Sequence, residues 1–467
     1  MGDCFGTDQS SQAFAIWAKK RDIFLHPDVA FLVPTKTMGL GVFTRKPLPE
    51  GTVVVSCPFK SSISPYGDFP LDSPCISALA KLRLKDNVLH VVLRLMAEAV
   101  RPSSPWLPWL RACPHMPDHF FNGSALGNLF DAREVTPIGS VSASWTELSQ
   151  HLRDVEVKRR WEEAQEVMQR YPEHWPQGHA TFALFCECLA LVLSRNFHRE
   201  EVHGREGPYL LPGVDLTNHS CTANVRMELR GGGRKNPTNF CLIASRALRQ
   251  REQIFCSYGK IGVARFAIEF QFVTEDVVKE DTLRFSTDVI TDMIECLVKD
   301  ASDLLPYKIS SDTIRARIER LQRLGFLFDE GLFVSRLPSP LPSGGSGGDA
   351  VPSVVAKEVQ MLFNVMYLMT TNPEEFEHLI HTINRDWRVE RTGRLVKLVE
   401  KVLMLRVEAA RLQQSLAEQI LTKAEDAGRK KLLQVTLNSE LEMLQLLQEH
   451  IVQDASVPFS RGELNHV

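Results

Sequence analysis

The period of the hydrophobic pattern changes along the chain, and this change limits the possible folds more than the composition does. Short apolar stretches broken by Gly and Pro, which are typical of strands, occupy residues 31–56 and return at 224–258. Apolar residues at helical spacing fill most of the region between them and the chain after residue 274. The pattern predicts an α+β fold, in which a β-rich domain is split by a helical insert and followed by an all-α region.

The length of 467 residues exceeds what one hydrophobic core normally supports, so we expect two main domains. A short N-terminal helical region is predicted over residues 1–30. The β-rich domain is predicted over 31–273, with its helical insert at about 73–198. The helical domain is predicted over 274–467, and its Pro-, Ser- and Gly-rich segment 337–350 has the composition of a flexible loop.

The same periodicity places individual elements. Helices are predicted over residues 12–20, 78–99, 155–171, 180–197, 313–324 and 354–371. Strands are predicted over residues 224–229, 239–244 and 252–258. The leucine-rich tail 393–454, interrupted near Ala427-Gly428, predicts a long helical hairpin whose leucines form a core rather than a partner site.

Composition and charge narrow the class of protein. A net charge of −3 favours neither a nucleic acid nor an anionic membrane as partner. The N-terminus lacks a secretory signal and no apolar run could span a bilayer, so we expect a protein of the cytoplasm, the nucleus or both. The ten cysteines form no zinc framework, and no metal site is predicted. Reduced, buried thiols are expected at Cys57, Cys75, Cys113, Cys241 and Cys296.

Three separated motifs carry the candidate chemistry. They are Met38-Gly39-Leu40-Gly41-Val42-Phe43, Asp215-Leu216-Thr217-Asn218-His219-Ser220-Cys221 and Glu252-Gln253-Ile254-Phe255-Cys256-Ser257-Tyr258-Gly259. Each has an ordinary structural explanation when taken alone: a turn, a satisfied polar corner and a core tyrosine. The first is no dinucleotide-binding fingerprint, because it lacks the third glycine and strand-like sequence follows it. Their order and spacing carry more information than any one of them.

In this order, and with Ser194-Arg195-Asn196-Phe197 upstream, the motifs resemble those of the SET-domain methyltransferases. The resemblance is to the branch typified by the Rubisco large-subunit lysine methyltransferase. It covers most of the chain, including the helical insert, the segments 106–110 and 321–326, and the helical domain, which is similar to the substrate-binding module of that branch. It implies a SET-domain β-fold in which the Asn-His segment passes beneath a neighbouring loop to form a pseudoknot.

The resemblance also implies a site for S-adenosyl-L-methionine and a catalytic tyrosine, Tyr258. The implied cofactor-binding residues are Met38, Gly39, Leu40, Arg195, Asp215, Asn218, His219 and Tyr258. Their chemistry fits this ligand, because glycine lets the backbone approach closely and arginine suits a carboxylate. Methyl transfer from a sulfonium is an in-line displacement, so the protein has mainly to align a neutral nucleophile and exclude water.

The chain departs from the family pattern at places that bear on the site, including the stretch after Asn218-His219-Ser220, which lacks a tyrosine that some relatives use to flank the substrate. Met38 stands where the family usually has a glutamate or a small residue. Phe270-Gln271-Phe272 stands where the family usually reads Tyr-Gly-Phe, so a second active-site tyrosine is missing. Fewer hydroxyl groups near the acceptor alter how many methyl groups can be added. Cys221 is interpreted as structural, since no cysteine-rich tail follows it.

These observations predict a protein-lysine N-methyltransferase that acts on a non-histone protein docked on the helical domain, as a monomer and without nucleic acid or membrane. Transfer to a histidine by the same branch is one alternative. A catalytically inactive scaffold is another, motivated by Met38 and by the 270–272 segment. The target, the number of methyl groups and the choice between cytoplasm and nucleus stay open.

Overall fold

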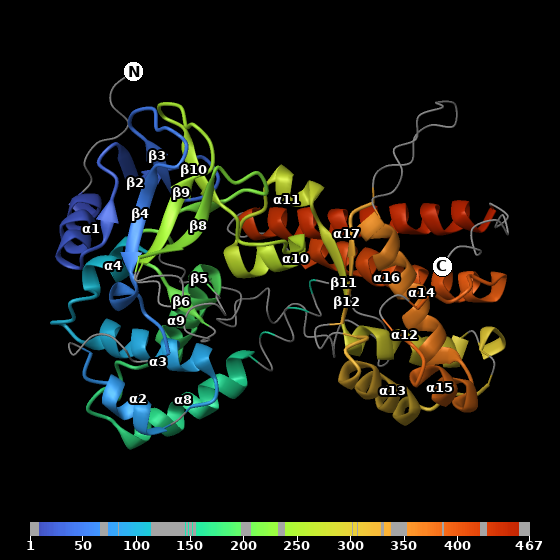
Figure 1. Cartoon of the computed structure of the whole chain (residues 1–467). Helices are drawn as coiled ribbons and strands as arrows, with labels where there is room; N and C mark the ends of the chain where they lie inside the picture. Colours follow the sequence, from blue (N-terminus) through green and yellow to red (C-terminus); the bar gives the residue numbers. More distant parts are fainter. Residues whose placement is uncertain are drawn as a thin grey trace. The chain divides into compact units, whose positions relative to one another are not determined.

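The structure is a computed structural model, and it divides into two compact units that are described separately (Figure 1). The β-rich unit comprises residues 1–128, 151–259 and 268–272, and the helical unit comprises 129–150, 260–267 and 273–467. The residues that the structure describes are 9–65, 73–82, 84–113, 145, 148, 152, 156–197, 207–231, 239–300, 302–305, 307–327, 331–337, 353–384, 387–420 and 427–456.

Two four-stranded sheets form the frame of the β-rich unit. The first has the order β1 (Phe24–Leu25), β4 (Val53–Pro58), β9 (Asn239–Ala244) and β8 (Val225–Arg230). The second has the order β2 (Val29–Pro34), β3 (Leu40–Thr44), β10 (Gln253–Cys256) and β7 (Asn218–His219). All neighbours are antiparallel except β10 and β7, which run parallel with Phe255 opposite Asn218. This one parallel pair sets the middle motif beside the strand that leads to Tyr258.

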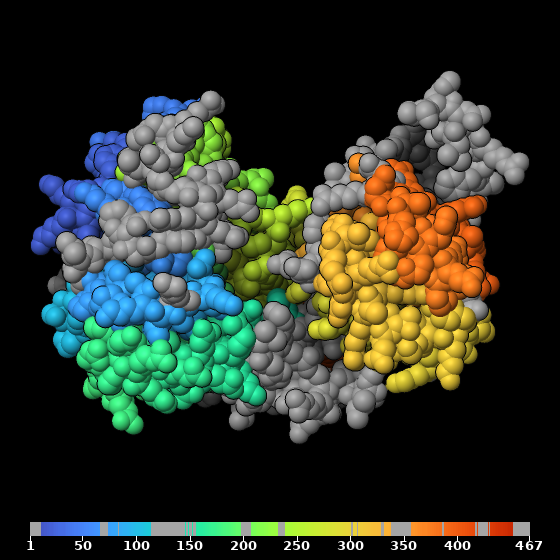
Figure 2. All heavy atoms as spheres, turned by 60° about the horizontal axis from the view of Figure 1, so that its bottom comes forward, coloured from blue at the N-terminus to red at the C-terminus, as the bar shows by residue number. Residues whose placement is uncertain are grey.

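Helices complete the β-rich unit. One lies at the N-terminus, and the others fall in the sequence between β4 and β5. They are α1 (Gln9–Lys20), α2 (Ile76–Leu82), α3 (Asn87–Val100), α4 (Leu107–Ala112), α8 (Lys158–Arg170) and α9 (Phe182–Arg195), with a short 3-10 helix, η1 (Phe59–Ser61). A small two-stranded sheet of β5 (Asn196–Phe197) and β6 (Tyr209–Leu210) follows α9. The side chains of α8, in green, lie next to those of the 76–100 segment, in light blue, on the face that Figure 2 shows.

Asp86 explains why the helix predicted over 78–99 is two helices. It caps α3, because its carboxylate accepts a hydrogen bond from the backbone N–H of Leu89 at 3.0 Å. The same carboxylate pairs with Arg159 at 2.7 Å and Arg160 at 2.8 Å, both from α8. Because Asp86 both caps α3 and binds α8, a tertiary contact helps to fix the start of α3, and hydrophobic periodicity alone does not show it.

The helical unit contains most of the remaining helices and one small sheet. Its elements are α10 (Val263–Arg265), α11 (Glu275–Lys279), β11 (Thr282–Phe285), α12 (Thr287–Asp300), η4 (Ser302–Leu304), α13 (Ser311–Arg323), β12 (Leu332–Ser335), α14 (Ser353–Thr370), α15 (Pro373–Ile380), α16 (Gly393–Ile420) and α17 (Ala427–Ser456). One turn of π-helix, η3 (Phe266–Phe270), joins α10 to the 268–272 segment of the β-rich unit.

The prediction of an all-α C-terminal domain is wrong in one respect, because β11 and β12 form an antiparallel pair with Phe285 opposite Leu332. Gly331 permits this pair. Its φ is +96°, and a Cβ there would lie 2.2 Å from the carbonyl oxygen of Phe285. The strands are only four residues long, so their alternation is too brief to stand out from the helical pattern around them.

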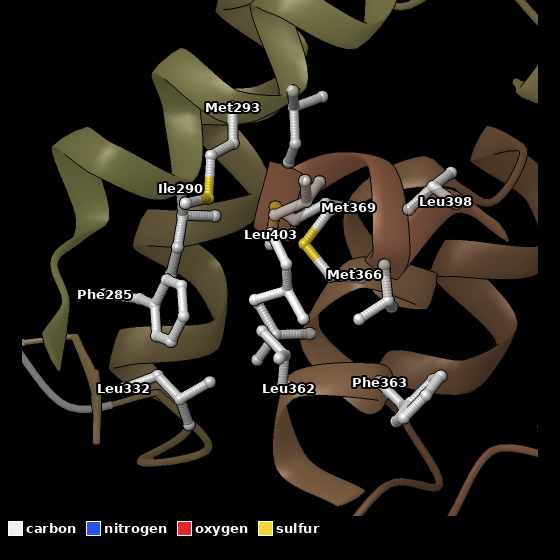
Figure 3. Close-up of a cluster of buried hydrophobic side chains, with 14 of the residues drawn as sticks. Phe285, Ile290, Met293, Leu332, Leu362, Phe363, Met366, Met369, Leu398 and Leu403 are labelled. Atoms are coloured by element: carbon white, nitrogen blue, oxygen red, sulfur yellow. The ribbon is translucent and has the colours of Figure 1, made fainter. Parts of the chain in front are cut away.

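Figure 3 shows part of the core of the helical unit, where the labelled side chains come from the small sheet and from α12, α14 and α16. The labelled residues are Phe285, Ile290, Met293, Leu332, Leu362, Phe363, Met366, Met369, Leu398 and Leu403. All of them are buried. Burying one such side chain contributes about 1.5–3 kcal/mol, so this cluster supplies much of the unit's stability.

The predicted helical hairpin is present as α16 and α17, and most of its leucines are buried as expected. Leu412 differs, because its side chain is 42% exposed. Arg406 of α16 and Glu440 of α17 form a buried ion pair at 2.7 Å, which links the two helices. Of the loop predicted over 337–350, all but Leu337 lies outside the described residues.

Candidate functional site

A cavity of about 210 Å³ in the β-rich unit brings the separated motifs together. Six of the sequence-predicted residues lie on its wall: Met38, Gly39, Leu40, Arg195, Asn218 and Tyr258. The other lining residues are Leu32, Thr37, Ala112, Ser194, Leu216, Phe270, Gln271 and Phe272. The cavity is therefore lined by the β2–β3 hairpin, the end of α9, the segment around β7, Tyr258, and the residues at and just after the end of the π-helix.

The turn between β2 and β3 forms one side of the cavity. It is closed by Thr35, whose N–H donates to the Gly39 carbonyl at 2.7 Å and whose Oγ1 accepts from the Met38 N–H at 2.8 Å. Gly39 has a φ of +66°, which favours glycine. At Gly41 a Cβ would lie 2.8 Å from Gln253 Nε2 and 3.1 Å from Asn218 Nδ2. The two glycines thus serve different needs, a turn at Gly39 and close packing at Gly41.

Asn218 ties this turn to the middle motif. Its side chain is buried, and Nδ2 donates to the Leu40 carbonyl oxygen at 3.0 Å. Asn218 reaches this position because β7 runs parallel to β10, and β10 in turn pairs with β3. The hydrogen bond therefore joins residues 178 positions apart and fixes the backbone that lines the cavity.

His219 positions Tyr258. Its Nδ1 accepts a hydrogen bond from the Tyr258 backbone N–H at 3.0 Å, and the two rings lie 5.2 Å apart. The Tyr258 hydroxyl donates to the Thr217 carbonyl oxygen at 2.7 Å. Burial raises the pKa of the Tyr258 hydroxyl well above its usual range, so the group stays neutral. With its proton directed at Thr217, the hydroxyl oxygen has lone pairs left to accept a hydrogen bond.

Arg195 is the last residue of α9, and its side chain lines the cavity. Its Nη1 donates to the backbone oxygen of Asp215, and its Nε is buried without a hydrogen-bond partner among the described residues. The Asp215 carboxylate accepts from Trp109 Nε1 and from the Gly213 N–H, each at 2.9 Å. Burial raises the pKa of Asp215 to about 6, although Arg195 and the two donors oppose this.

Asp215 and His219, predicted to line the cofactor pocket, are not on the cavity wall. Both lie behind it, where Asp215 accepts from Trp109 and Gly213, and His219 accepts from Tyr258. Their cofactor contacts stay predictions. Sequence reasoning missed Thr35, which shapes the turn, and Thr217, whose carbonyl orients Tyr258. A backbone carbonyl carries no sequence signal, whereas a threonine before a glycine turn is a weak one.

The segment that departs from the family pattern lies at the same cavity. Phe270, Gln271 and Phe272 all line it, and the Phe270 ring lies 4.9 Å from that of Tyr258. A phenylalanine therefore packs on the candidate catalytic tyrosine. The departure seen in the sequence is a change in the site itself.

Other features of the described residues concern metal ligands, membrane-spanning helices and thiols. No group of three His, Cys, Asp or Glu side chains among them is placed to hold a metal ion. Within the same part of the chain, no helix has the length and apolar character needed to cross a membrane. Cys57, Cys75, Cys113, Cys241 and Cys296 form no disulfide and are buried, as predicted. Cys221 is exposed, with its Sγ 3.6 Å from His219 Nε2.

Similarity to known proteins agrees with this geometry. Three solved structures match 96% of the chain over 92% of their own: the SET domain of LSMT bound to lysine and AdoHcy, with 17% identity and a TM-score of 0.58, and Rubisco LSMT bound to sinefungin and monomethyllysine, with 16% and 0.57, or bound to AdoMet, with 16% and 0.58. At these identities the likeness is one of fold. No curated protein matches in sequence.

The family model described as SET domain matches residues 39–259, which begin in the glycine turn and end directly after Tyr258. Every segment of the cavity except the π-helix region and the residues before Gly39 falls within this match. Residues 39–259 therefore match the SET domain, and the chain has the fold seen in Rubisco LSMT.

Proposed function

We propose that this protein is an S-adenosylmethionine-dependent protein-lysine N-methyltransferase. The observation that carries the proposal is the single cavity, within the matched SET domain, that unites the glycine turn, Arg195, Asn218 and Tyr258. The similar structures support the cofactor and the acceptor, because they hold AdoMet, AdoHcy, lysine or monomethyllysine.

The residues present fit this cofactor. Arg195 has a buried Nε donor with no hydrogen-bond partner among the described residues, and a guanidinium suits a carboxylate better than any neutral group. The turn at Gly39 has open space where a side chain would stand, so the backbone can approach a ligand closely. Asn218 holds the Leu40 carbonyl in place at the same wall.

The chemistry requires little beyond alignment. S-adenosylmethionine, when bound, supplies a methyl group activated by a cationic sulfonium. A free lysine has a pKa of about 10.4 and must lose its proton, which desolvation beside a positive charge favours. Tyr258 can accept a hydrogen bond from the amine while its own hydroxyl proton is donated to the Thr217 carbonyl oxygen, so it aims the nitrogen without taking part in proton transfer.

We further propose that the acceptor is a non-histone protein of the cytoplasm or nucleus, docked on the helical unit of a monomer. Candidate contacts on that unit are its exposed large apolar side chains, Leu324 at 54%, Met404 at 46% and Leu412 at 42%. The net charge of −3 favours a protein over a nucleic acid as partner.

Calorimetric titration of S-adenosylmethionine into the wild type and into Asn218→Ala tests the cofactor site. Losing the bond to Leu40 should weaken binding about tenfold or more, because the wall is no longer fixed. Asn438→Ala, at an exposed position of α17, is the matched control and should bind as the wild type does. A folded wild type that binds no cofactor at millimolar concentration would contradict the proposal, and mass spectrometry of the methylated residue separates lysine from histidine transfer.

A further inference from the structure

One side of α16 carries a row of mainly basic side chains that face away from the core of the helical unit. Residues three and four positions apart in a helix lie on one face. The row consists of Arg394, Lys397, Lys401, Met404, Glu408, Arg411, Leu412 and Ser415. All are exposed except Lys401, which is half-buried. From Arg394 to Leu412 the row is about 27 Å long, at 1.5 Å per residue, and we call it the basic face of α16.

The charges on the basic face are unfavourable for the helix that carries them. Arg394, Lys397 and Lys401 follow one another at spacings of three and four residues, where like charges destabilise a helix. Arg394 also lies in the first turn, where the helix dipole favours negative charge, and that turn contains no acidic residue. No described residue forms an ion pair with these three cations or with Arg411. An acidic ligand would offset the repulsion.

The other residues of the basic face narrow the kind of ligand. Met404 is 46% exposed and Leu412 is 42% exposed, although the solvent side of a helix is usually polar. Glu408 lies in the same row, between Lys401 and Arg411, where its carboxylate would repel the phosphates of a nucleic acid. The combination of unpaired cations and exposed apolar side chains therefore fits an acidic protein segment that has apolar side chains of its own.

We propose that the basic face of α16 docks an acidic, partly apolar segment of the methyl-accepting protein. Carboxylates of that segment pair with Arg394, Lys397 and Lys401, and its apolar side chains cover Met404 and Leu412. The basic face lies outside residues 39–259, so it acts on the binding of the acceptor and not on the transfer step. The proposal rests on the proposed function, because it takes the ligand to be the acceptor.

Charge reversal at the centre of the basic cluster tests the docking. Lys397→Glu/Lys401→Glu removes the repulsion between neighbouring cations, so the double variant should fold as the wild type does. We expect methyl transfer from labelled S-adenosylmethionine to proteins in an extract of the cells that make this protein to fall about tenfold or more. Affinity for S-adenosylhomocysteine, measured by calorimetry, should stay within about twofold of the wild type.

A second double variant supplies the matched control. Lys158→Glu/Arg170→Glu makes the same change in net charge at exposed positions of α8, in the β-rich unit. It should label the extract as the wild type does. Labelling by the wild type should also weaken as the salt concentration rises from about 50 to about 300 mM, because exposed charge pairs are screened.

A synthetic peptide tests the chemistry of the ligand directly. The probe is a fluorescent helical peptide of glutamate, leucine and alanine, and a second peptide has glutamine in place of glutamate. By fluorescence anisotropy, the wild type should bind the acidic peptide about tenfold more tightly than it binds the glutamine peptide. Lys397→Glu/Lys401→Glu should lose this preference. A single-stranded DNA oligonucleotide serves as the third probe and should not bind to the basic face.

The outcomes separate this proposal from the proposed function. Equal labelling of the extract by the wild type and Lys397→Glu/Lys401→Glu overturns the docking proposal alone. Equal affinity of the wild type for the two peptides does the same, as does binding of the oligonucleotide that this double variant abolishes. A folded wild type that binds no S-adenosylhomocysteine overturns the proposed function as well.

Discussion

One arginine from each unit shows two different uses of a guanidinium group. In the helical unit, Arg317 donates from Nη1 to the carbonyl oxygens of Leu368, Met369 and Thr371 at 2.8–3.0 Å, and so closes the end of α14. In the β-rich unit, Arg195 also ends on a backbone oxygen, but it keeps a buried Nε free of any partner among the described residues and lines a cavity.

This difference shows how similar residues divide between stability and binding. A guanidinium surrounded by carbonyl groups joins helices and offers little to a ligand. One that is only partly satisfied at a cavity wall is available to a ligand, at a cost to the unligated protein. Substitutions in the helical core should therefore change the free energy of unfolding, whereas those at the cavity should change binding and turnover.

The largest effect should come from Tyr258→Phe. Removing the hydroxyl takes away the hydrogen bond to Thr217 and the oxygen that aims the acceptor, so methyl transfer should slow at least about 100-fold. Affinity for S-adenosylmethionine should stay within about twofold. Single-turnover kinetics and calorimetry measure the two quantities, with Tyr307→Phe, in the helical unit, as the control. Near-normal turnover in the Tyr258 variant would refute the catalytic assignment.

Leu403→Ala tests the comparison in the core of the helical unit. Leu403 is fully buried in the helical core, so truncation should lower the free energy of unfolding by about 3–4 kcal/mol. Its neighbour Met404 is 46% exposed, and Met404→Ala should cost less than about 1 kcal/mol. Denaturant unfolding measures both, and cofactor affinity of the folded Leu403 variant should equal that of the wild type. Equal losses at the two positions would show that the core is not where the structure places it.

The smallest effect is one of pH, and both units contribute to it. Burial raises the pKa of Asp215 in the β-rich unit and of Asp281 in the helical unit to about 6. The folded state then holds protons more tightly than the unfolded state, so each group destabilises the fold as pH rises from about 4 through 6. Relative to the wild type, Asp215→Asn and Asp281→Asn should each gain about 2–3 kcal/mol over this range.

Cofactor binding separates the two aspartates. Asp215 accepts from Gly213, in the segment that leads to the cavity, and its backbone oxygen accepts from Arg195. Asp281 instead accepts from Ser439 and from the Val263 N–H within the helical unit. Calorimetry above pH 7 should therefore show weaker binding in Asp215→Asn only. A parallel loss in Asp281→Asn would break the division between the two units.

Much of the fold follows from sequence pattern, because long periodic segments are governed by local propensity. The strand predicted over 239–244 is β9, and the helix predicted over 354–371 is α14 with a shift of one residue. The two-residue strands β5 and β7 were not predicted, because pairing with a distant strand and not local pattern creates them. The helix predicted over 180–197 ends earlier, at Arg195, where the chain enters β5.

The sequence by itself determined the α+β class, the resemblance to the SET-domain methyltransferases and the motifs that contribute residues to the cavity. The reason is that residue types and their order along the chain carry this information directly. Only the tertiary structure decided which of those residues reach the wall. Asn218 reaches the wall because β7 pairs in parallel with β10. Asp215 and His219 do not line the cavity. Gln271, whose backbone is left-handed, does line it. Such placement depends on long-range pairing and backbone conformation, which local pattern does not encode.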